Sequence, residues 1–375
     1  MKNLPNNCLL RLILAGMLIT VSAEVAVPQD YGFLYWEYGW RGRSPKDERV
    51  LSVLTSHYGA CFDVEKAALT GLGTITSPLA YAEAVSDIQL LPDRLPAASL
   101  TLEVVIEDTV YKCSGADLDK FKGLESPSRL IETGRYLQRF DIQELCFKSD
   151  WGALLECKGR LEVVAWPEGL CILFEMGNAA KLASASLRIT LQTDEKTVRE
   201  EHKFIATDSG ETPRVGLHWQ PDNTPVEQTQ DRVEVKGKQA DDADLTVSYD
   251  ADRNWHRVAL PAEQFSLAED TEHMDTYPLY LKNHGDTPVS VPLLFSLEGA
   301  FSGITGMSAM ILDVEGNQTG IPVQLSKNWH QQADKPELYE GPWFHGITMI
   351  SLEPGEVWEG ALDRKSTRLN SSHYS

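Results

Sequence analysis

The sequence predicts an all-β protein, an antiparallel β-sandwich or super-sandwich built from two β-rich parts. Nearly every periodic segment alternates apolar and polar residues with period two, whereas helical periodicity is confined to residues 78–89. Turn-forming residues separate these segments at short intervals, as in Trp166–Gly169 (WPEG). A regular series of short strands with such turns is typical of sandwiches and large curved sheets.

The start of the chain is interpreted as a targeting signal. Lys2 and Arg11 are basic, Leu12–Val21 is apolar, and Val21–Ala23 offers small residues for cleavage. We therefore expect residues 1–23 to be a secretory signal peptide. The apolar run is too short to span a bilayer and no other run approaches that length. This predicts a secreted, periplasmic or cell-envelope protein without a transmembrane segment.

The end of the chain is interpreted as foreign sequence. Residues 363–373 read DRKSTRLNSSH, which matches the translation of a sequencing-library adapter. We expect residues 363–375 to be an artefact and the natural sequence to be interrupted near Leu362.

Residues 24–210 are expected to form an N-terminal β-rich domain. It begins with the aromatic strand 31–38, and residues 78–89 are its one plausible helix. The strands expected to follow the first are 50–55, 60–64, 67–71, 100–111, 134–142, 144–148, 153–157, 160–166, 170–175 and 185–192.

Residues 211–231 are polar and contain prolines, so we expect a loop or linker there. A C-terminal β-sandwich, truncated at residue 362, is expected over 232–362. Pro288 and Pro292 favour an edge position for the strand that contains them. The expected strands are 232–235, 245–249, 255–260, 277–281, 289–298, 309–314, 321–325, 344–352 and 357–361.

Charge and cysteine content narrow the class of protein. The formal net charge is −21 with no basic stripe, which argues against a nucleic-acid partner. Five cysteines follow the signal peptide, none in a CxxC motif. Export permits disulfides, and Cys146 and Cys157 could bridge neighbouring strands; the alternative is buried free thiols.

The strongest candidate site lies near the C-terminus, where tryptophan, histidine and amide side chains cluster between strand patterns. Indole faces stack on sugar rings, polar side chains orient the hydroxyl groups, and a histidine near neutral pH can transfer protons. We assign catalysis to His330 and His345. Substrate binding is assigned to Lys327, Asn328, Trp329 and Trp343. The alternative is that the tryptophans close one end of the sandwich and the histidines cap backbone groups.

Weaker candidates are acidic pairs of the kind glycoside hydrolases use: Asp313 with Glu315, Glu337 with Glu340, and Asp250 with Asp252. The segment around Glu315 is more simply a hairpin turn. Residues 250–254 (DADRN) begin like a calcium loop but lack its glycine and its final glutamate. No metal site is therefore assigned, and the cofactor is left open.

His57 with Tyr58 is a fainter candidate, since a His/Tyr pair is one arrangement used in polysaccharide lyases. A tight strand connection is the simpler interpretation.

Four segments carry a resemblance to a family: RLIETGRYLQRFDI, GRLEVVAWPEGLCILFEM, TGIPVQLSKNWH and GPWFHGITMISLEPG. They resemble an uncharacterised secreted bacterial family over most of residues 30–360, and their style is similar to galactose-mutarotase-like super-sandwiches. The resemblance implies a fold shared by many polysaccharide lyases and hydrolases, and it implies no functional residue.

We therefore expect an exported carbohydrate-active protein, either a polysaccharide lyase or a glycoside hydrolase, with a polysaccharide or glycan as its partner. The alternative is a non-catalytic glycan-binding or cell-envelope structural module.

Overall fold

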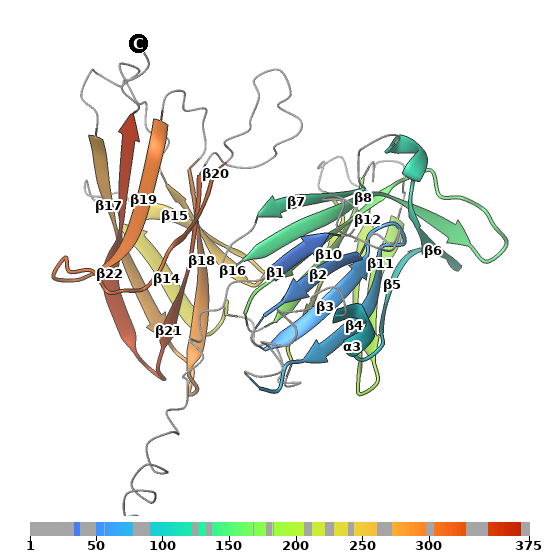
Figure 1. The fold of residues 1–375 in the computed structure, drawn as a ribbon, viewed down its shortest axis with the longest axis horizontal. Helices are drawn as coiled ribbons and strands as arrows, with labels where there is room; N and C mark the ends of the chain where they lie inside the picture. Colours follow the sequence, from blue (N-terminus) through green and yellow to red (C-terminus); the bar gives the residue numbers. More distant parts are fainter. Residues whose placement is uncertain are drawn as a thin grey trace, which may run out of the picture.

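A computed structural model of the chain shows an all-β protein in two β-rich parts that lie side by side (Figure 1). Among the described residues, no helix is long and apolar enough to cross a membrane. The structure describes residues 34–37, 50–55, 57–77, 91–121, 127–132, 137–167, 169–177, 182, 184–205, 212–221, 229–238, 244–260, 272–297, 304–327 and 344–368. The helix expected at 78–89 lies outside them.

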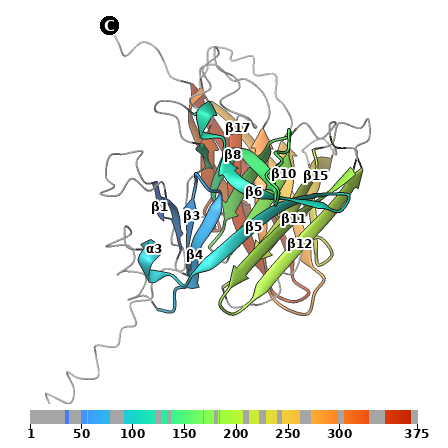
Figure 2. The same cartoon turned by 90° about the vertical axis from the view of Figure 1, so that its right-hand side faces the viewer.

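The first part consists of two sheets. The smaller has the order β1-β2-β3-β4 and is antiparallel throughout. In Figure 2 it forms a separate layer beside β5 and β8. A short helix, α3, packs on β3 and β4. The bounds are β1 Leu34–Glu37, β2 Val50–Leu54, β3 Tyr58–Asp63, β4 Ala68–Thr74 and α3 Leu91–Arg94.

The larger sheet has nine strands in the order β12-β11-β5-β6-β8-β9-β10-β13, with β7 paired to β8. A single apolar core joins the two sheets, because β3 contributes Tyr58 and Phe62 while β8 contributes Phe140. The bounds are β5 Ala98–Ile106, β6 Thr109–Ala116, β7 Ser128–Glu132, β8 Gln138–Ser149, β9 Gly159–Ala165, β10 Leu170–Met176, β11 Ser184–Thr193, β12 Thr197–Ile205 and β13 Arg214–Trp219. A 3₁₀ turn spans Leu118–Lys120.

Two left-handed residues explain where strand prediction fails in this sheet. The strand expected at 100–111 is a hairpin of β5 and β6, turned at Glu107, whose φ is +52°. The strands expected at 134–142 and 144–148 are one strand, β8, whose register shifts at Glu144, where φ is +54°. In β8 the buried apolar side chains change from even positions, as in Phe140 and Ile142, to odd positions, as in Leu145 and Phe147, across the register shift. The apolar pattern therefore divides there although the strand continues.

The expectation of a loop or linker at 211–231 is wrong for the first half of that segment. Residues 214–219 form β13, which pairs with β10 along its full length and so belongs to the first part. Val215, Leu217 and Trp219 alternate inward from this strand. The surrounding prolines and polar residues conceal a strand of only six residues.

The second part is one sheet with the order β19-β22-β17-β14-β15-β16-β18-β21-β20. Val233, Tyr277 and Leu281 from one half of this order meet Val258, Leu293 and Phe295 from the other half in one core, so the sheet folds over on itself as a sandwich. The bounds are β14 Val233–Lys238, β15 Asp244–Asp250, β16 Trp255–Leu260, β17 Glu272–Asn283, β18 Val289–Leu297, β19 Ile304–Asp313, β20 Gln324–Lys327, β21 Phe344–Leu352 and β22 Val357–Arg368.

The strand that contains Pro292 is not an edge strand, as its prolines had suggested. β18 lies between β21 and β16, and its pairing with β16 is parallel, unlike the antiparallel pairs expected. Pairing with β16 begins at Leu293, one residue after Pro292, which itself pairs only with Met349 on β21. The proline therefore needs no hydrogen bond on its second side.

β22 continues into residues 363–368, where it pairs with β17 and β19. The origin of that segment stays a prediction, because strand pairing does not test it.

Candidate functional site

The cluster predicted from the sequence is only partly described. Asn328, Trp329, His330 and Trp343 lie outside the described residues. Lys327 ends β20, where its backbone pairs with Phe344, and His345 pairs with Ser326 on the same strand pair. The backbones of Lys327 and His345 are thus one register step apart at the same end of the sheet. The convergence of all six side chains stays a prediction.

Asp313 serves as the cap of a turn. Its Oδ1 accepts hydrogen bonds from the backbone N–H groups of Glu315 at 2.9 Å and Asn317 at 2.8 Å. These bonds, that from Asn317 foremost, lower the pKa of Asp313. Gly316 has a φ of +84° in this turn. The hairpin-turn interpretation is confirmed, and Glu337 and Glu340 lie outside the described residues.

His57 and Tyr58 form a tight connection between β2 and β3, as the simpler interpretation predicted. His57 is exposed and Tyr58 is buried. The Tyr58 hydroxyl donates a hydrogen bond shared between the carbonyl oxygens of Trp166, at 3.0 Å, and Gly169, at 2.9 Å. Tyr58 therefore holds the turn between β9 and β10 in place.

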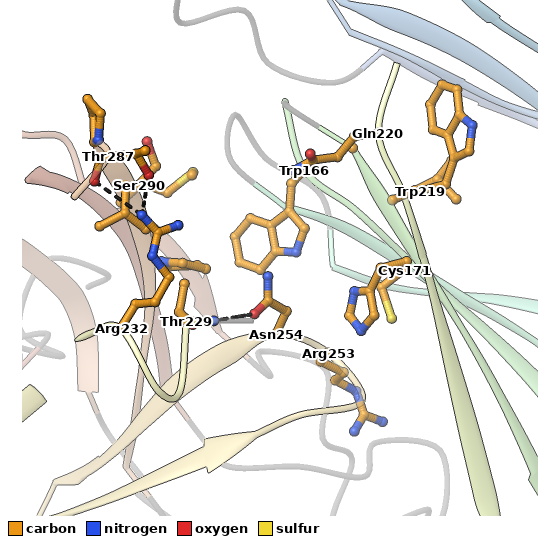
Figure 3. Close-up of a pocket in the computed structure, with 17 residues that line it drawn as sticks. Trp166, Cys171, Trp219, Gln220, Thr229, Arg232, Arg253, Asn254, Thr287 and Ser290 are labelled. Atoms are coloured by element: carbon orange, nitrogen blue, oxygen red, sulfur yellow. Dashed lines mark hydrogen bonds between the residues drawn. The ribbon is translucent and has the colours of Figure 1, made fainter. Parts of the chain in front are cut away.

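A cavity of about 450 Å³ lies where this turn faces the second part of the chain (Figure 3). From the first part, Trp166, Cys171, His218, Trp219 and Gln220 line it, and the second part contributes Thr229, Arg232, Arg253, Asn254 and Ser290. Among the described residues that line the cavity, none is an aspartate or a glutamate. Its volume is within the range of small-molecule sites, about 300–1,000 Å³.

Two indoles form the aromatic wall of the cavity. The Trp166 ring packs edge-to-face on Trp255 of the second part, with centroids 5.9 Å apart and planes at 86°. Trp219 packs in the same way on Tyr58 at 5.4 Å. Each tryptophan side chain is 9% exposed, so only a small area of ring faces the cavity. Their packing holds both rings in fixed positions.

Asn254 presents a hydrogen-bond donor to the cavity from the turn between β15 and β16. Its Oδ1 accepts from the hydroxyl of Tyr249 at 2.6 Å and from the backbone N–H of Thr229 at 3.2 Å. A backbone N–H can only donate, so the acceptor must be the oxygen and the amide orientation is fixed. The side-chain nitrogen points toward Trp166 (Figure 3). Asn254 also has a φ of +54°, a left-handed conformation that asparagine adopts readily in turns.

Beneath the cavity, Arg253 joins the two parts through an ion pair with Glu162 on β9. Its Nε lies 2.8 Å from Glu162 Oε1 and its Nη2 lies 3.0 Å from Oε2, while Nη1 binds Asp250 at 2.8 Å. Burial raises the pKa of Glu162, but the bonds from Arg253 and the charges of Arg139, Arg253 and Arg160 outweigh it and lower the pKa to about 2.

Asp250 and Asp252, considered above as a catalytic pair, are engaged by arginines. Asp250 binds Arg253, and Asp252 binds Arg214 of β13 at 2.6 Å. Neither carboxylate lines the cavity. Their geometry fits a structural role in docking this turn onto the first part.

The same turn makes two further contacts with the first part. His218 Nε2 donates to the carbonyl of Ala251 at 3.2 Å, which leaves Nδ1 as the acceptor of a neutral ring. Burial lowers the pKa of His218, which favours that neutral form. The Cys171 thiol donates to the carbonyl of Asp252 at 2.6 Å, and burial raises its pKa.

The five cysteines described are free thiols, and Cys146 is not bonded to Cys157. The alternative of buried free thiols is confirmed for Cys61, Cys157 and Cys171, whereas Cys113 and Cys146 are partly exposed. Lys158 instead donates to the Cys146 sulfur at 2.9 Å. Among the described residues, no three histidine, cysteine or acidic side chains are grouped so as to hold a metal ion.

Sequence reasoning missed this cavity, although it marked both of its key segments. The turn 166–169 was identified as a boundary and the segment 250–254 as an incomplete calcium loop. Only the folded structure brings them together. The one signal available was a tryptophan within a turn, a position where a large apolar side chain needs a partner from elsewhere.

Comparisons with known proteins add little. No family model matches the chain, and no curated protein matches it. Among solved structures, 4-α-glucanotransferase from Thermococcus litoralis is similar with a TM-score of 0.23 and 6% identity, covering 86% of this chain and 38% of that one. The chain thus spans well under half of that enzyme. Galactose 1-epimerase from Lactobacillus acidophilus NCFM has a TM-score of 0.21 and 9% identity, covering 90% and 99%. Both scores are too low to carry an argument about function.

Proposed function

We propose that this is a carbohydrate-binding protein whose ligand occupies the cavity between the two β-rich parts. The observation that carries the proposal is the lining, which combines the fixed indoles of Trp166 and Trp219 with the amide of Asn254 and the polar side chain of Gln220. A sugar presents an apolar C–H face and a rim of hydroxyl groups. Indole rings complement the C–H face, and amide and hydroxyl side chains form hydrogen bonds with the sugar hydroxyl groups.

The lining favours binding over glycoside hydrolysis in this cavity. Hydrolysis of a glycosidic bond generally uses two carboxyl groups, one as an acid and one as a base or nucleophile. The described lining residues include no carboxylate. This cavity therefore supports the glycan-binding alternative more strongly than a hydrolase.

A polysaccharide lyase or hydrolase activity remains part of the proposal at the 327–345 segment. His330 or His345 would transfer the proton, Lys327 and Asn328 would hold the substrate, and Trp329 and Trp343 would stack on sugar rings. Sequence chemistry supports this assignment, and so does the pairing of β20 with β21, in which the backbones of Lys327 and His345 are one register step apart.

We also propose that the protein is exported, to the medium, the periplasm or the cell envelope. The basic start, the apolar run and the small residues before Glu24 support export. Determination of the N-terminus of the natively produced protein tests this: cleavage after Ala23 is expected, and a retained Met1 would contradict it.

The binding proposal is tested by filling the cavity. Ser290 lines it at the start of β18, so Ser290→Trp should occupy the space without removing a buried side chain. The matched control is Ser308→Trp, at an exposed position of β19. Retention on immobilised neutral, uronic and sulfated polysaccharides is measured for all three proteins. We expect Ser290→Trp alone to lose retention while its melting temperature is kept. Equal retention of both variants would place binding elsewhere.

The same panel separates binding from catalysis. New reducing ends and unsaturated uronic ends are followed together. Unsaturated ends that disappear in His330→Ala or His345→Ala would support a lyase at that segment. Reducing ends alone would indicate a hydrolase, and retention without either product would support a binding module. Absence of both retention and cleavage would refute the carbohydrate proposal.

A further inference from the structure

A lysine, a cysteine and an aspartate meet on the larger sheet of the first part. Asp117 follows β6, Cys146 lies on β8, and Lys158 directly precedes β9. Lys158 Nζ donates to Cys146 Sγ at 2.9 Å and to Asp117 Oδ2 at 2.8 Å. None of the three lines the cavity between the two parts, so the cluster is separate from the proposed ligand site.

Lys158 is a cation in contact with the cysteine sulfur. Burial opposes its charge, but the hydrogen bonds to Asp117 and Cys146 outweigh burial and raise the pKa of Lys158. The thiolate is the reactive form of a cysteine, and an ammonium group beside it balances the thiolate charge. A second contact of the sulfur, with the carbonyl oxygen of Glu144, is long at 4.0 Å. The contact with Lys158 is therefore the shorter one and the one that carries charge.

Cys146 is accessible, unlike most of the cysteines that the structure describes. It is partly exposed, and the side chain of Lys158 is 34% exposed, so a small molecule can reach both groups. Cys113 is also partly exposed, but burial raises its pKa to about 11. The remaining described cysteines are buried: Cys61, Cys157 and Cys171. A small oxidant should therefore react first at Cys146.

We propose that a peroxide joins Cys146 to Lys158 by a covalent bond between the cysteine sulfur and the lysine nitrogen, a sulfenamide. This inference is independent of the proposed function. In the first step the thiolate attacks one peroxide oxygen, so that an S–O bond forms and the O–O bond breaks. The ammonium of Lys158 gives a proton to the departing hydroxide, which leaves as water. The peroxide is reduced, and the sulfur is oxidised to a sulfenic acid.

The first step prepares the second, because Lys158 loses its proton while it lies beside the sulfur. The neutral amine attacks the sulfur of the sulfenic acid, an S–N bond forms, and the S–O bond breaks. The hydroxide leaves as water with a proton from the nitrogen. Sulfenic acids condense with nitrogen in this way. Asp117 accepts a hydrogen bond from the same nitrogen and so holds it at the sulfur.

The cross-link closes the base of one hairpin. Cys146 and Lys158 flank residues 147–157, in which the side chains of Trp151 and Leu154 are 69% and 63% exposed. Oxidation therefore fixes the base of a segment that presents apolar side chains to solvent. A thiol reductant reverses the reaction: two thiols are oxidised to a disulfide while the cysteine and the lysine are restored.

The test treats the folded protein with hydrogen peroxide and maps its tryptic peptides by mass spectrometry without reduction. Trypsin does not cleave after a modified lysine, so the cross-link should join peptide 140–148 to peptide 149–160. The mass of the product should be lower than the sum of the two peptides by two hydrogen atoms. A thiol reductant should release peptide 140–148 and restore cleavage after Lys158.

The same map distinguishes the cross-link from a disulfide. A disulfide from Cys146 to Cys157 would join peptide 140–148 to a peptide that ends at Lys158, because this lysine would still be cleaved. A disulfide to Cys113 would join peptide 140–148 to peptide 113–120.

Three variants separate the two steps. Lys158→Arg keeps the positive charge but lacks the amine, so Cys146 should still be oxidised and should stay a sulfenic acid, which dimedone traps. Lys158→Gln removes the charge and should slow the oxidation of Cys146 several-fold. Lys148→Arg is the matched control, because Lys148 is an exposed lysine on the same strand as Cys146. It should still form the cross-link.

The outcomes decide between the cross-link and ordinary oxidation. The linked peptide in the parent and in Lys148→Arg, with a trapped sulfenic acid in Lys158→Arg, supports the proposal. A disulfide of Cys146, a sulfinic acid without the linked peptide, or no oxidation of Cys146 in the parent overturns it. Equal oxidation rates of Cys146 in the parent and in Lys158→Gln also overturn it, because Lys158 would then take no part in the first step.

Discussion

Arg253 and Glu162 are joined by two parallel hydrogen bonds of 2.8 and 3.0 Å, and they come from different β-rich parts of the chain. Glu162 lies on β9 and its side chain is 2% exposed; Arg253 lies in the turn between β15 and β16 and is 11% exposed. A buried pair with this geometry fixes the orientation of one part against the other. The residue after Arg253 is Asn254, so the same turn docks the two parts and presents the cavity donor.

Removing the charge of Glu162 should weaken this docking. Glu162→Gln leaves Arg253, Arg160 and Arg139 with less compensating charge in a buried position, and we expect a loss of about 3 kcal/mol in the free energy of unfolding. Urea unfolding measures it. Glu201→Gln is the control, because Glu201 pairs with Arg188 near the surface and should change stability little. Equal effects of the two substitutions would contradict the docking role of Glu162.

Stability should fall when the pH falls from about 6.5 to 4. His256 is buried against the ring of Tyr249, and burial lowers its pKa from 6.5 to about 4. The unfolded chain therefore takes up a proton in this window that the native imidazole does not, which costs up to about 3 kcal/mol. Urea unfolding at pH 7 and pH 5 should show less loss in His256→Asn than in the parent or in the control His284→Asn, whose histidine is half exposed. An equal loss in all three would exclude His256 as the cause.

A second acid transition should follow at lower pH. Glu162 has a folded pKa of about 2 against 4.5 for the ordinary group. Its contribution to stability is complete above 4.5 and is lost as the pH falls through 2. In Glu162→Gln the free energy of unfolding should therefore depend less on pH between 4.5 and 2, while its dependence between pH 6.5 and 4.5, due to His256, stays unchanged. If the variant loses stability below pH 4.5 as steeply as the parent, the assignment is wrong.

Gly216 allows the docking turn to approach β13. A Cβ at this position would lie 2.7 Å from the backbone oxygen of Asp252, which cannot be moved as a side chain can. Gly216→Ala should push the turn away, destabilise the protein by about 1–3 kcal/mol and weaken ligand binding. The control Gly177→Ala places its Cβ 3.4 Å from the nearest backbone atom. The melting temperature and ligand affinity of both variants check this prediction. If Gly216→Ala changes neither quantity, the contact between Gly216 and Asp252 is not tight.

Two tyrosines, Tyr58 in the core and the partly buried Tyr249, should separate effects on stability from effects on recognition. Tyr58→Phe removes a hydroxyl that holds the turn of Trp166 and should cost about 1 kcal/mol of stability. Tyr249→Phe removes the 2.6 Å bond that orients the amide of Asn254, and should lower ligand affinity more than it lowers stability. Melting temperature and ligand affinity are measured for each variant. If Tyr249→Phe lowers stability but leaves ligand affinity unchanged, Asn254 does not contact the ligand.

Much of the fold could be predicted from alternation alone. The strands Trp255–Leu260 and Phe344–Leu352 were predicted with the bounds observed. β12 was missed because its sequence, TVREEHKFI, is charged; it is an edge strand with mostly exposed side chains. Such charged edges protect a sheet from further pairing and so carry no alternating apolar signal.

The candidate site was harder to predict for a different reason. Trp166 and Asn254 lie far apart in the sequence and meet because the turn that carries Asn254 docks onto the first part, through Arg253 and Glu162 and through the contacts of Ala251 and Asp252. Short-range sequence patterns predict the turns in which Trp166 and Asn254 lie, but they do not predict which turns pack together in the fold. The parallel pairing of β16 with β18 was hidden in the same way, since it joins strands that are not neighbours in the sequence.

The edge-to-face pair of Trp166 and Trp255 joins the two parts with ring centroids 5.9 Å apart. Two indoles packed rigidly in an asymmetric surrounding give a circular dichroism signal that depends on their relative orientation. A shift of one part against the other should therefore change the tryptophan signal of the protein without any added label.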